Sequence, residues 1–318
     1  MSVRRFVIAL GGNAIVPLDT SGTYLDQYQI TKTTMNQVAE LTGMGHRVVL
    51  THGNGPVVGN IFLRNEAGFA TYGIPPMPLF VCGADSQGGL GYMIQQNLQN
   101  AMTVLGLDVP VAAVVTQVLV DREDPAFANP TKPIGPYYDR EQAERVAQEF
   151  GWVVREDAGR GWRRVVPSPR PQRVMEAGVI RAMLEAGVLV VACGGGGVPV
   201  VPCGGGRIEG IDAVIDKDLA SELLAELVGA DTLVIVTQVE KVYSGFGTPA
   251  QAALDLADAA ELRRLQAAGE FPAGSMGPKI EAALAFLDAG GREVVITDPE
   301  HLLAAVRGEA GTRIVAEL

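Results

Sequence analysis

Three lysines stand in short loops rich in glycine, proline or aspartate, where a fixed positive charge could bind an anion. The chain contains five lysines against twenty arginines, and these three are Lys132, Lys217 and Lys279. Because arginine supplies nearly all the other positive charge, the few lysines indicate positions that need a compact point charge. The alternative is that these lysines stand in such loops by chance. The residues around each lysine help to decide between the two interpretations.

The surroundings of Lys217 favour an anion site. It lies between Asp216 and Asp218, whose charges favour the ammonium form of its side chain. Leucines at helical spacing follow, which predicts an amphipathic helix with Asp218 suited to be its N-cap. A capped helix with a solvated lysine is the alternative. The leucines are Leu219, Leu223, Leu224 and Leu227.

Lys279 also stands at the start of a predicted helix, over residues 280–289, directly after Gly277 and Pro278. A lysine there is unfavourable against the helix dipole unless an anion binds, so the position indicates a phosphate site. Upstream, a predicted buried strand over residues 232–237 is followed by Tyr243. Its ring could stack on a nucleotide base, or it could be a packed surface tyrosine.

Three predicted buried strands, at residues 6–10, 47–50 and 188–192, each run into a glycine-rich loop. In open α/β folds such strand ends present backbone N–H groups to ligands. The four glycines at 194–197 form neither a Walker A loop nor a Rossmann fingerprint, because a second loop over 198–207 follows. His52, at the second strand end, is interpreted as structural rather than as a general base.

An apolar run at residues 109–119 is interpreted as a central strand. The segment after it, residues 121–171, interrupts the alternation of strands and helices. Two tryptophan-led segments, 152–155 and 162–166, predict a β-hairpin. Lys132 lies between Pro130 and Pro133, which restrict its backbone. We therefore expect an inserted subdomain that carries one fixed cation, either as a lid or as a dimer-contact arm.

Composition narrows the class of protein. A chain of 318 residues suffices for one large α/β domain or two smaller ones, and a net charge of −11 argues against nucleic-acid binding. No apolar run is long enough to span a membrane, and residues 6–10 are expected to be a first strand rather than part of a signal peptide. Three widely spaced cysteines form neither a disulfide framework nor a zinc pattern, so we expect a cytoplasmic protein.

Taken in order, the motifs resemble those of the carbamate kinases of the amino-acid kinase family, over almost the whole chain. The resemblance implies an α/β fold, a three-layer αβα sandwich around a mainly parallel sheet with an inserted protruding lid subdomain, in a homodimer. It implies a carbamate-binding half (residues 1–120 and 172–190), the lid (121–171) and a nucleotide-binding half (191–318). The matching segments are residues 10–14, 51–56, 129–136, 166–169, 212–218 and 274–279.

The resemblance also implies roles for individual residues. The catalytic residues would be Lys132, Lys217, Lys279 and Asp218. Substrate would be bound by Gly11, Gly12, Asn13, Gly53, Asn54 and Gly55. The nucleotide would be bound by Gly195, Gly196, Asp216, Thr237, Tyr243, Met276 and Gly277. No side chain is assigned as a metal ligand, and Mg²⁺ is expected with ATP or ADP.

The implied reaction is reversible phosphoryl transfer between ATP and carbamate, giving ADP and carbamoyl phosphate, used to make ATP in arginine metabolism. Asn13 stands where many relatives that phosphorylate carboxylates have lysine, which favours carbamate over acetylglutamate. Val57 and Gln238 depart from the glutamine and aspartate expected at their positions. The alternatives are a kinase for acetylglutamate, aspartate or a nucleoside monophosphate, and a non-catalytic nucleotide sensor.

Overall fold

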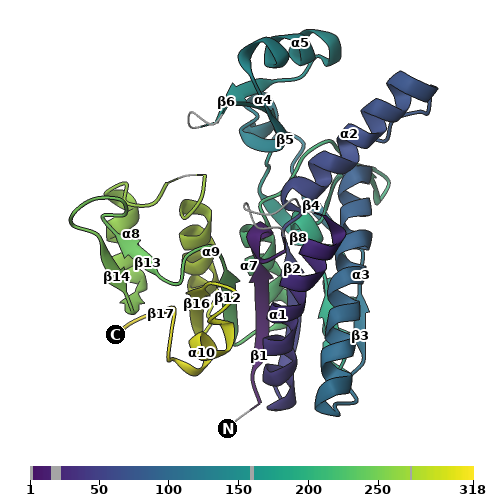
Figure 1. The fold of residues 1–318 in the computed structure, drawn as a ribbon. Helices are drawn as coiled ribbons and strands as arrows, with labels where there is room; N and C mark the ends of the chain where they lie inside the picture. Colours follow the sequence, from purple (N-terminus) through teal and green to yellow (C-terminus); the bar gives the residue numbers. More distant parts are fainter. Residues whose placement is uncertain (1–2, 16–22, 158–160, 273) are drawn as a thin grey trace.

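In the computed structural model an eight-stranded sheet forms the centre of the molecule (Figure 1). The structure describes residues 3–15, 23–157, 161–272 and 274–318. The strand order is β15-β17-β16-β12-β1-β2-β9-β3, and the strands are parallel except that β17 and β15 run the opposite way. The strands are β1 (Arg5–Leu10), β2 (Arg47–His52), β3 (Val111–Ala113), β9 (Leu189–Val191), β12 (Thr232–Val236), β15 (Leu256–Asp258), β16 (Glu293–Thr297) and β17 (Thr312–Val315).

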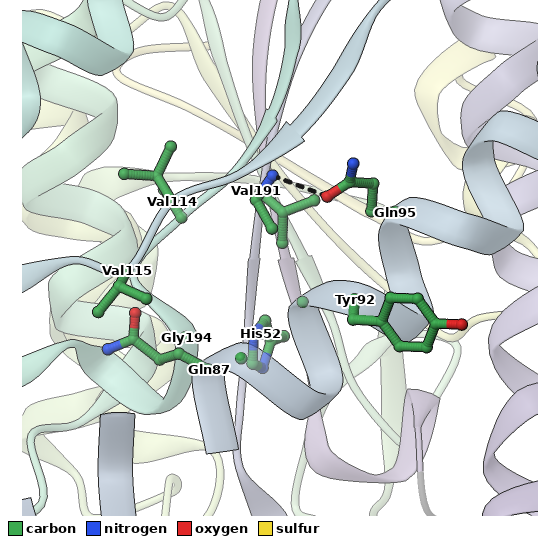
Figure 2. A pocket seen from close by; sticks show the side chains of 12 residues that line it. His52, Gln87, Tyr92, Gln95, Val114, Val115, Val191 and Gly194 are labelled. Atoms are coloured by element: carbon green, nitrogen blue, oxygen red, sulfur yellow. Dashed lines mark hydrogen bonds between the residues drawn. The ribbon is translucent and has the colours of Figure 1, made fainter. Parts of the chain in front are cut away.

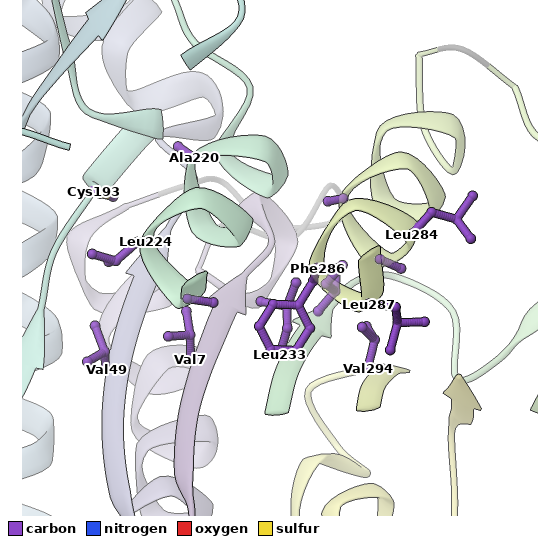
Figure 3. Packing of buried hydrophobic residues seen from close by; sticks show 14 of the residues in the cluster. Val7, Val49, Cys193, Ala220, Leu224, Leu233, Leu284, Phe286, Leu287 and Val294 are labelled. Carbon is purple, nitrogen blue, oxygen red and sulfur yellow. The ribbon is translucent and has the colours of Figure 1, made fainter. Parts of the chain in front are cut away.

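Helices cover both faces of this sheet, because its parallel strands are apolar on both sides. Phe6 and Ile8 of β1 belong to the core formed with α1 and α3, whereas Val7 between them belongs to the core formed with α6, α7 and α9. Figure 3 shows this second core, with Leu224 and Phe286 packed over the strands. The predicted αβα sandwich is confirmed. These helices are α1 (Tyr24–Gly43), α3 (Leu79–Leu105), α6 (Ala177–Glu185), α7 (Lys217–Val228) and α9 (Gly277–Asp288).

A small subdomain protrudes from this core within the segment predicted to be inserted (Figure 1). Its antiparallel strands contain the predicted hairpin, β6 with β7. Arg164 lies over the rings of both Phe62 and Trp152, 4.4 and 4.5 Å from their centres, which packs the subdomain onto helix α2. A Cβ on Gly59 would lie 2.4 Å from the Cα of Gly135, so α2 and β5 touch through their backbones. The elements are α2 (Gly55–Tyr72), β5 (Lys132–Tyr138), α5 (Arg140–Phe150), β6 (Val154–Glu156) and β7 (Trp162–Val166).

Two sequence interpretations were wrong in this part of the fold. The apolar run at 109–119 is not one central strand: β3 lies at the edge of the main sheet, and β4 belongs to a second sheet of order β11-β10-β4-β8. The chain leaves the main sheet at Thr116: its N–H donates to the Gln87 side chain, and its carbonyl accepts from Gln87 and from the N–H of Val198 at the start of β10. Residues 198–207 are not a loop but mostly the hairpin of β10 and β11. These strands are β4 (Gln117–Val120), β8 (Pro171–Val174), β10 (Val198–Gly204) and β11 (Arg207–Gly210).

Shorter elements connect the layers and close the C-terminal half. Within the described ranges, no helix combines the length and the apolar character needed to cross a membrane. The remaining elements are η1 (Gly12–Ala14), α4 (Pro125–Ala128), η2 (Gly194–Gly196), β13 (Val242–Ser244), β14 (Ala252–Leu254), α8 (Ala259–Ala267) and α10 (Leu302–Arg307).

Candidate active site

The carboxyl ends of β1 and β2 bring two of the glycine-rich loops into contact. The N–H of Gly53 donates to the carbonyl of Leu10 at 2.9 Å, which continues the strand pairing into the loops. A Cβ on Gly53 would lie 3.3 Å from Cδ of Lys217, and one on Gly12 would lie 3.4 Å from the Cα of Gly55. The glycines therefore let the Lys217 stem and both loops pack closely. The side chain of Asn13 lies outside the described part of the chain.

Asp218 holds two of the three predicted lysines. Its Oδ1 accepts a hydrogen bond from Nζ of Lys217, and its Oδ2 accepts one from Nζ of Lys279 at 3.1 Å. The carboxylate is buried, with 3% of its side chain exposed. Lys279 also donates to the carbonyl of Ser275 at 3.2 Å, so its ammonium is held from two sides. One buried carboxylate thus fixes two cations side by side at the start of α7 and α9.

The third predicted lysine reaches the same place from the protruding subdomain. Nζ of Lys132, the first residue of β5, donates to Oδ2 of Asp216 at 2.6 Å. The other oxygen of Asp216 accepts the backbone N–H of Asp218 at 2.9 Å and caps α7. The N-cap predicted at Asp218 is therefore wrong: the helix starts earlier, which frees the Asp218 carboxylate for the lysines. The structure brings all three lysines together around two aspartates.

Burial and charge act in opposite directions on these groups. Burial raises the pKa of Asp216, but Lys132 and Lys217 outweigh it and bring that pKa to about 2. Asp218 likewise keeps a pKa below its usual value because Lys217 and Lys279 outweigh its burial. Burial lowers the pKa of Lys217, and Asp218 only partly offsets it. The expectation that flanking aspartates would dominate at Lys217 is therefore wrong, and a bound anion would favour its charged form.

A pair of buried hydroxyls supports the first turn of α7 from below. The hydroxyl of Ser221 donates to the carbonyl of Lys217 at 2.5 Å, and Thr51 at the end of β2 lies 2.5 Å from the Ser221 oxygen. Both side chains are fully buried. The backbone of Lys217 is therefore tied to the sheet, which limits where its side chain can reach.

A cavity of about 370 Å³ opens beside the two lysines held by Asp218. Its outer wall carries Tyr243 and Phe246, whose ring centres lie 6.1 Å apart. Lysines at one end and aromatic rings at the other can accept a flat ring that carries phosphates. The lining residues are Gly11, Gly12, Lys217, Thr237, Gln238, Val239, Tyr243, Phe246, Glu270, Phe271, Pro272, Gly274, Ser275, Met276 and Lys279.

Not all the predicted nucleotide residues line this cavity. Thr237, Tyr243 and Met276 do, whereas Gly195 and Gly196 lie elsewhere: a Cβ on Gly195 would meet Asn54, and one on Gly196 would meet the carbonyl of Ile215. Their loop packs behind the Gly53–Gly55 turn instead, because the chain continues into the second sheet. Asp216 and Gly277 are neighbours of the lining lysines in sequence and do not line the cavity.

Sequence reasoning missed several residues around the site. Phe246 and Glu270 line the cavity, and Glu270 accepts the N–H of Gly245 at 2.6 Å. Phe246 did carry a sequence signal, because it lies between two glycines. An aromatic residue in such a loop has no neighbouring apolar residues to pack against, so its exposure suggests a binding role. Thr51 and Ser221 have no sequence signal, because their contact joins residues 170 positions apart.

His52 lies outside this cavity and lines another, of about 210 Å³, between α3, β3 and the end of β9 (Figure 2). Its Nδ1 lies 2.9 Å from the carbonyl of Gly53, and burial lowers its pKa to about 4. Gln95 lines the same cavity and accepts the N–H of Ala113 at 3.2 Å. A buried, neutral histidine bound to backbone fits the structural interpretation.

The two aspartates at the site, Asp216 and Asp218, pair with lysines. Within the described ranges no cluster of three His, Cys, Asp or Glu side chains could hold a metal ion. All four carboxylate oxygens of Asp216 and Asp218 accept hydrogen bonds from the chain itself. This donor set fits an anionic ligand, and it fits Mg²⁺ only as an ion that arrives on phosphate oxygens.

Comparison with known proteins places the chain in a family. The profile of the Amino acid kinase family matches residues 4–298. The chain is 49% identical over 312 residues to a carbamate kinase of Pyrococcus furiosus, covering 98% of this chain and 99% of that protein. It is 48% identical over 310 residues to the carbamate kinase-like protein YahI of Escherichia coli, covering 97% and 98%. A carbamate kinase structure from Giardia lamblia bound to AMP-PNP has a TM-score of 0.90 at 42% identity and 99% coverage of both chains. The chain therefore belongs to the amino acid kinase family and is a kinase.

Proposed function

We propose that this chain catalyses reversible phosphoryl transfer between ATP and carbamate. The observation that carries the proposal is the likeness to carbamate kinases over nearly the full length of both chains, at 49% identity. The alternatives, an acetylglutamate, aspartate or nucleoside monophosphate kinase and a non-catalytic sensor, have no such support. Solved structures of N-acetylglutamate synthases match at only 16% and 17% identity, which shows the fold alone.

In this proposal Lys217 and Lys279 bind the nucleotide phosphates and the phosphoryl group in transfer. Carbamate is already an anion, so no general base is needed; the task is to align two anions and spread the developing charge. Asp218, which accepts hydrogen bonds from both ammonium groups, holds them at a fixed separation. Both lysine side chains stay in place when the phosphates leave, because the buried Asp218 carboxylate still accepts hydrogen bonds from them.

Lys132 approaches from the protruding subdomain, on the carbamate side. Its 2.6 Å bond to Asp216 joins the subdomain to the N-cap of α7, one residue before Lys217. We infer that this contact positions Lys132 over the carbamoyl oxygens. The N–H groups of Gly12 and Gly55 hold the remaining oxygens, because those of Gly11 and Gly53 donate to the carbonyls of Val236 and Leu10 at 2.9 Å. Asn13 and Asn54 stand next to these glycines in the sequence.

The nucleotide is placed with its base against Tyr243 and Phe246 and its phosphates toward Lys217 and Lys279. Thr237 and Met276 line that path and Gly277 follows Met276 in the chain, whereas Gly195 packs against Asn54 and Gly196 against Ile215. Mg²⁺ would arrive with the nucleotide and would neutralise part of the phosphate charge. The chain's own residues bind the phosphates.

The test is ATP formation from ADP, Mg²⁺ and carbamoyl phosphate, in the wild type beside Lys132→Ala. We expect rapid ATP formation that falls at least 100-fold in the variant, since removal of one donor to a transition-state oxygen costs about 3 kcal/mol. ADP affinity should change less than threefold, because Lys132 does not line the nucleotide cavity. If the wild type binds ADP but makes no ATP, carbamate is the wrong substrate, and acetylglutamyl phosphate and aspartyl phosphate are tried next.

We further propose that the working unit is a homodimer in the cytoplasm that makes ATP in arginine metabolism. Strand β3 is an edge of the main sheet, and Val115 and Tyr92 beside it are more than half exposed, a surface suited to a second copy. The three cysteines of the chain are free thiols, which suits a reducing compartment. Light scattering would measure the mass of the assembly, and cell fractionation its location.

A further inference from the structure

A second charged cavity lies at the other end of the sheet from the three lysines. It has a volume of about 720 Å³ and is lined by Arg4, Arg292, Arg307 and Arg313, from four separate segments. Arg4 and Arg292 immediately precede the buried parts of β1 and β16, whereas the lysine site lies past the carboxyl ends of these parallel strands. A strand of six residues is about 20 Å long, so the two sites are separate.

The charges around this cavity do not balance. Glu293, which is buried, accepts hydrogen bonds or ion pairs from both Arg4 and Arg313. Glu293 lies behind the wall, and Glu309 is a carboxylate that lines it. Four guanidinium groups against two carboxylates leave an excess of about two positive charges, in a protein whose net charge is −11.

Two of the arginines are free to bind a ligand. Arg292 and Arg307 are exposed, and within the described ranges neither side chain has a hydrogen bond or ion pair. Arg307 ends α10, where a cation is stabilised by the helix dipole. Guanidinium groups bind carboxylates and phosphates through paired N–H donors, so two unpaired arginines on one cavity form a ready anion site.

The rest of the wall is apolar. Met44, which is 44% exposed, follows α1, and Leu303 and Val306 stand on α10. His46 adds no charge: its Nδ1 accepts the N–H of Arg4 at 3.2 Å, and burial and the neighbouring arginine lower its pKa. Its ring meets Phe6 edge-on at 5.3 Å, which closes the floor of the cavity. A ligand here would meet guanidinium groups on one side and hydrocarbon on the other.

We infer that this cavity binds a small organic molecule that carries two negative charges on a compact apolar skeleton. The excess of about two positive charges at the cavity matches two negative charges on the ligand. The unpaired Arg292 and Arg307 would bind those charges. The apolar skeleton of the ligand would pack against Met44, Leu303 and Val306. The cavity volume lies in the range of sites for small molecules. The site is independent of the kinase site, because its residues stand at the opposite ends of the strands.

The probe is benzene-1,2-dicarboxylate, titrated by calorimetry into the full-length protein saturated with ADP, so that the lysine site is occupied. We expect one site with a submillimolar Kd, and at least tenfold weaker binding to the double variant Arg292→Gln, Arg307→Gln. Both side chains are exposed and unpaired, and only the helix-dipole contribution of Arg307 is lost, so the thermal midpoint should change by less than about 3 °C. The matched control is Arg140→Gln, Arg145→Gln on the protruding helix α5, which removes the same charge elsewhere and should bind like wild type.

Four results would overturn the inference. One is no binding to the ADP-saturated wild type, and another is equal binding by the Arg292, Arg307 variant. Weakening of equal size in the α5 control would mean that net charge, not this cavity, attracts the probe. Benzoate, with one charge on the same ring, should bind at least tenfold more weakly; equal affinity would refute the two-charge requirement. None of these readouts uses kinase turnover, so the outcome is independent of the proposed reaction.

Discussion

Asp218→Asn is the substitution that tests the site most directly. It keeps the size of the side chain and removes the charge that holds both Lys217 and Lys279. Nothing else described pairs with Lys217 Nζ, whereas Lys279 also binds the carbonyl of Ser275. The variant should therefore loosen Lys217 more than Lys279, and leave the N-cap at Asp216 in place.

The size of the effect follows from burial. The side chains of Lys217, Lys279 and Asp218 are 13%, 15% and 3% exposed, so solvent screens their interaction little. A hydrogen bond between charged groups contributes about 1.5–3 kcal/mol, and two are weakened here. If most of this loss falls on the alignment of the lysines in the transition state, kcat should fall by roughly 100-fold to 1000-fold.

The pH dependence of the activity gives a second test of the role of Asp218. Burial lowers the pKa of Lys217, and Asp218 is the main group that raises it again. The working form is the ammonium, so activity is lost as pH rises through this pKa. Without Asp218 the pKa falls further, and the alkaline loss of activity should begin at lower pH in Asp218→Asn than in wild type.

The assay is ATP formation from ADP, Mg²⁺ and carbamoyl phosphate across a pH series. The matched control is Asp255→Asn, the same change at an exposed pair, since Lys241 and Asp255 lie 2.6 Å apart with 79% of Asp255 exposed. An exposed pair contributes little, so the control should keep wild-type turnover. A kcat for Asp218→Asn within threefold of wild type, with an unchanged alkaline limb, would refute the reasoning.

Three further predictions follow from the geometry. Thr51→Val removes the hydroxyl that meets Ser221 under Lys217 and should lower kcat about tenfold with little change in the KM for ADP, while Thr51→Ser should restore it; a loss not rescued by serine would contradict a hydrogen-bonding role. Gly59→Ala places a Cβ 2.4 Å from Gly135 and should displace the protruding subdomain, so that turnover falls while ADP affinity, measured by calorimetry, is kept; normal turnover would mean that the contact can relax. The proton NMR signal of His52 should not titrate between about pH 5.5 and 8, because burial lowers its pKa to about 4, and a midpoint near 6.5 would show the ring to be accessible.

The sequence was sufficient for the local features of this protein. Apolar runs that end in glycines predicted β1, β2 and β9, and the order of motifs predicted the family, the αβα fold and the kinase activity, all confirmed by the comparisons. The scarcity of lysine was enough to single out Lys132, Lys217 and Lys279 as candidate anion-binding residues. These inferences succeed because strand burial and loop glycines are dictated by neighbours in sequence.

Tertiary structure decided whatever depends on distant partners. The sequence could not show that Lys132 pairs with Asp216, that Asp216 rather than Asp218 caps α7, or that burial would lower the pKa of Lys217. Likewise the run at 109–119 is as apolar as a central strand, but Thr116 within it pairs with the Gln87 side chain and with Val198 of β10, both distant in sequence. The hydrogen-bond partners and the desolvation of a side chain depend on residues that the fold places next to it. These residues are distant in sequence, so the order of residues along the chain does not identify them.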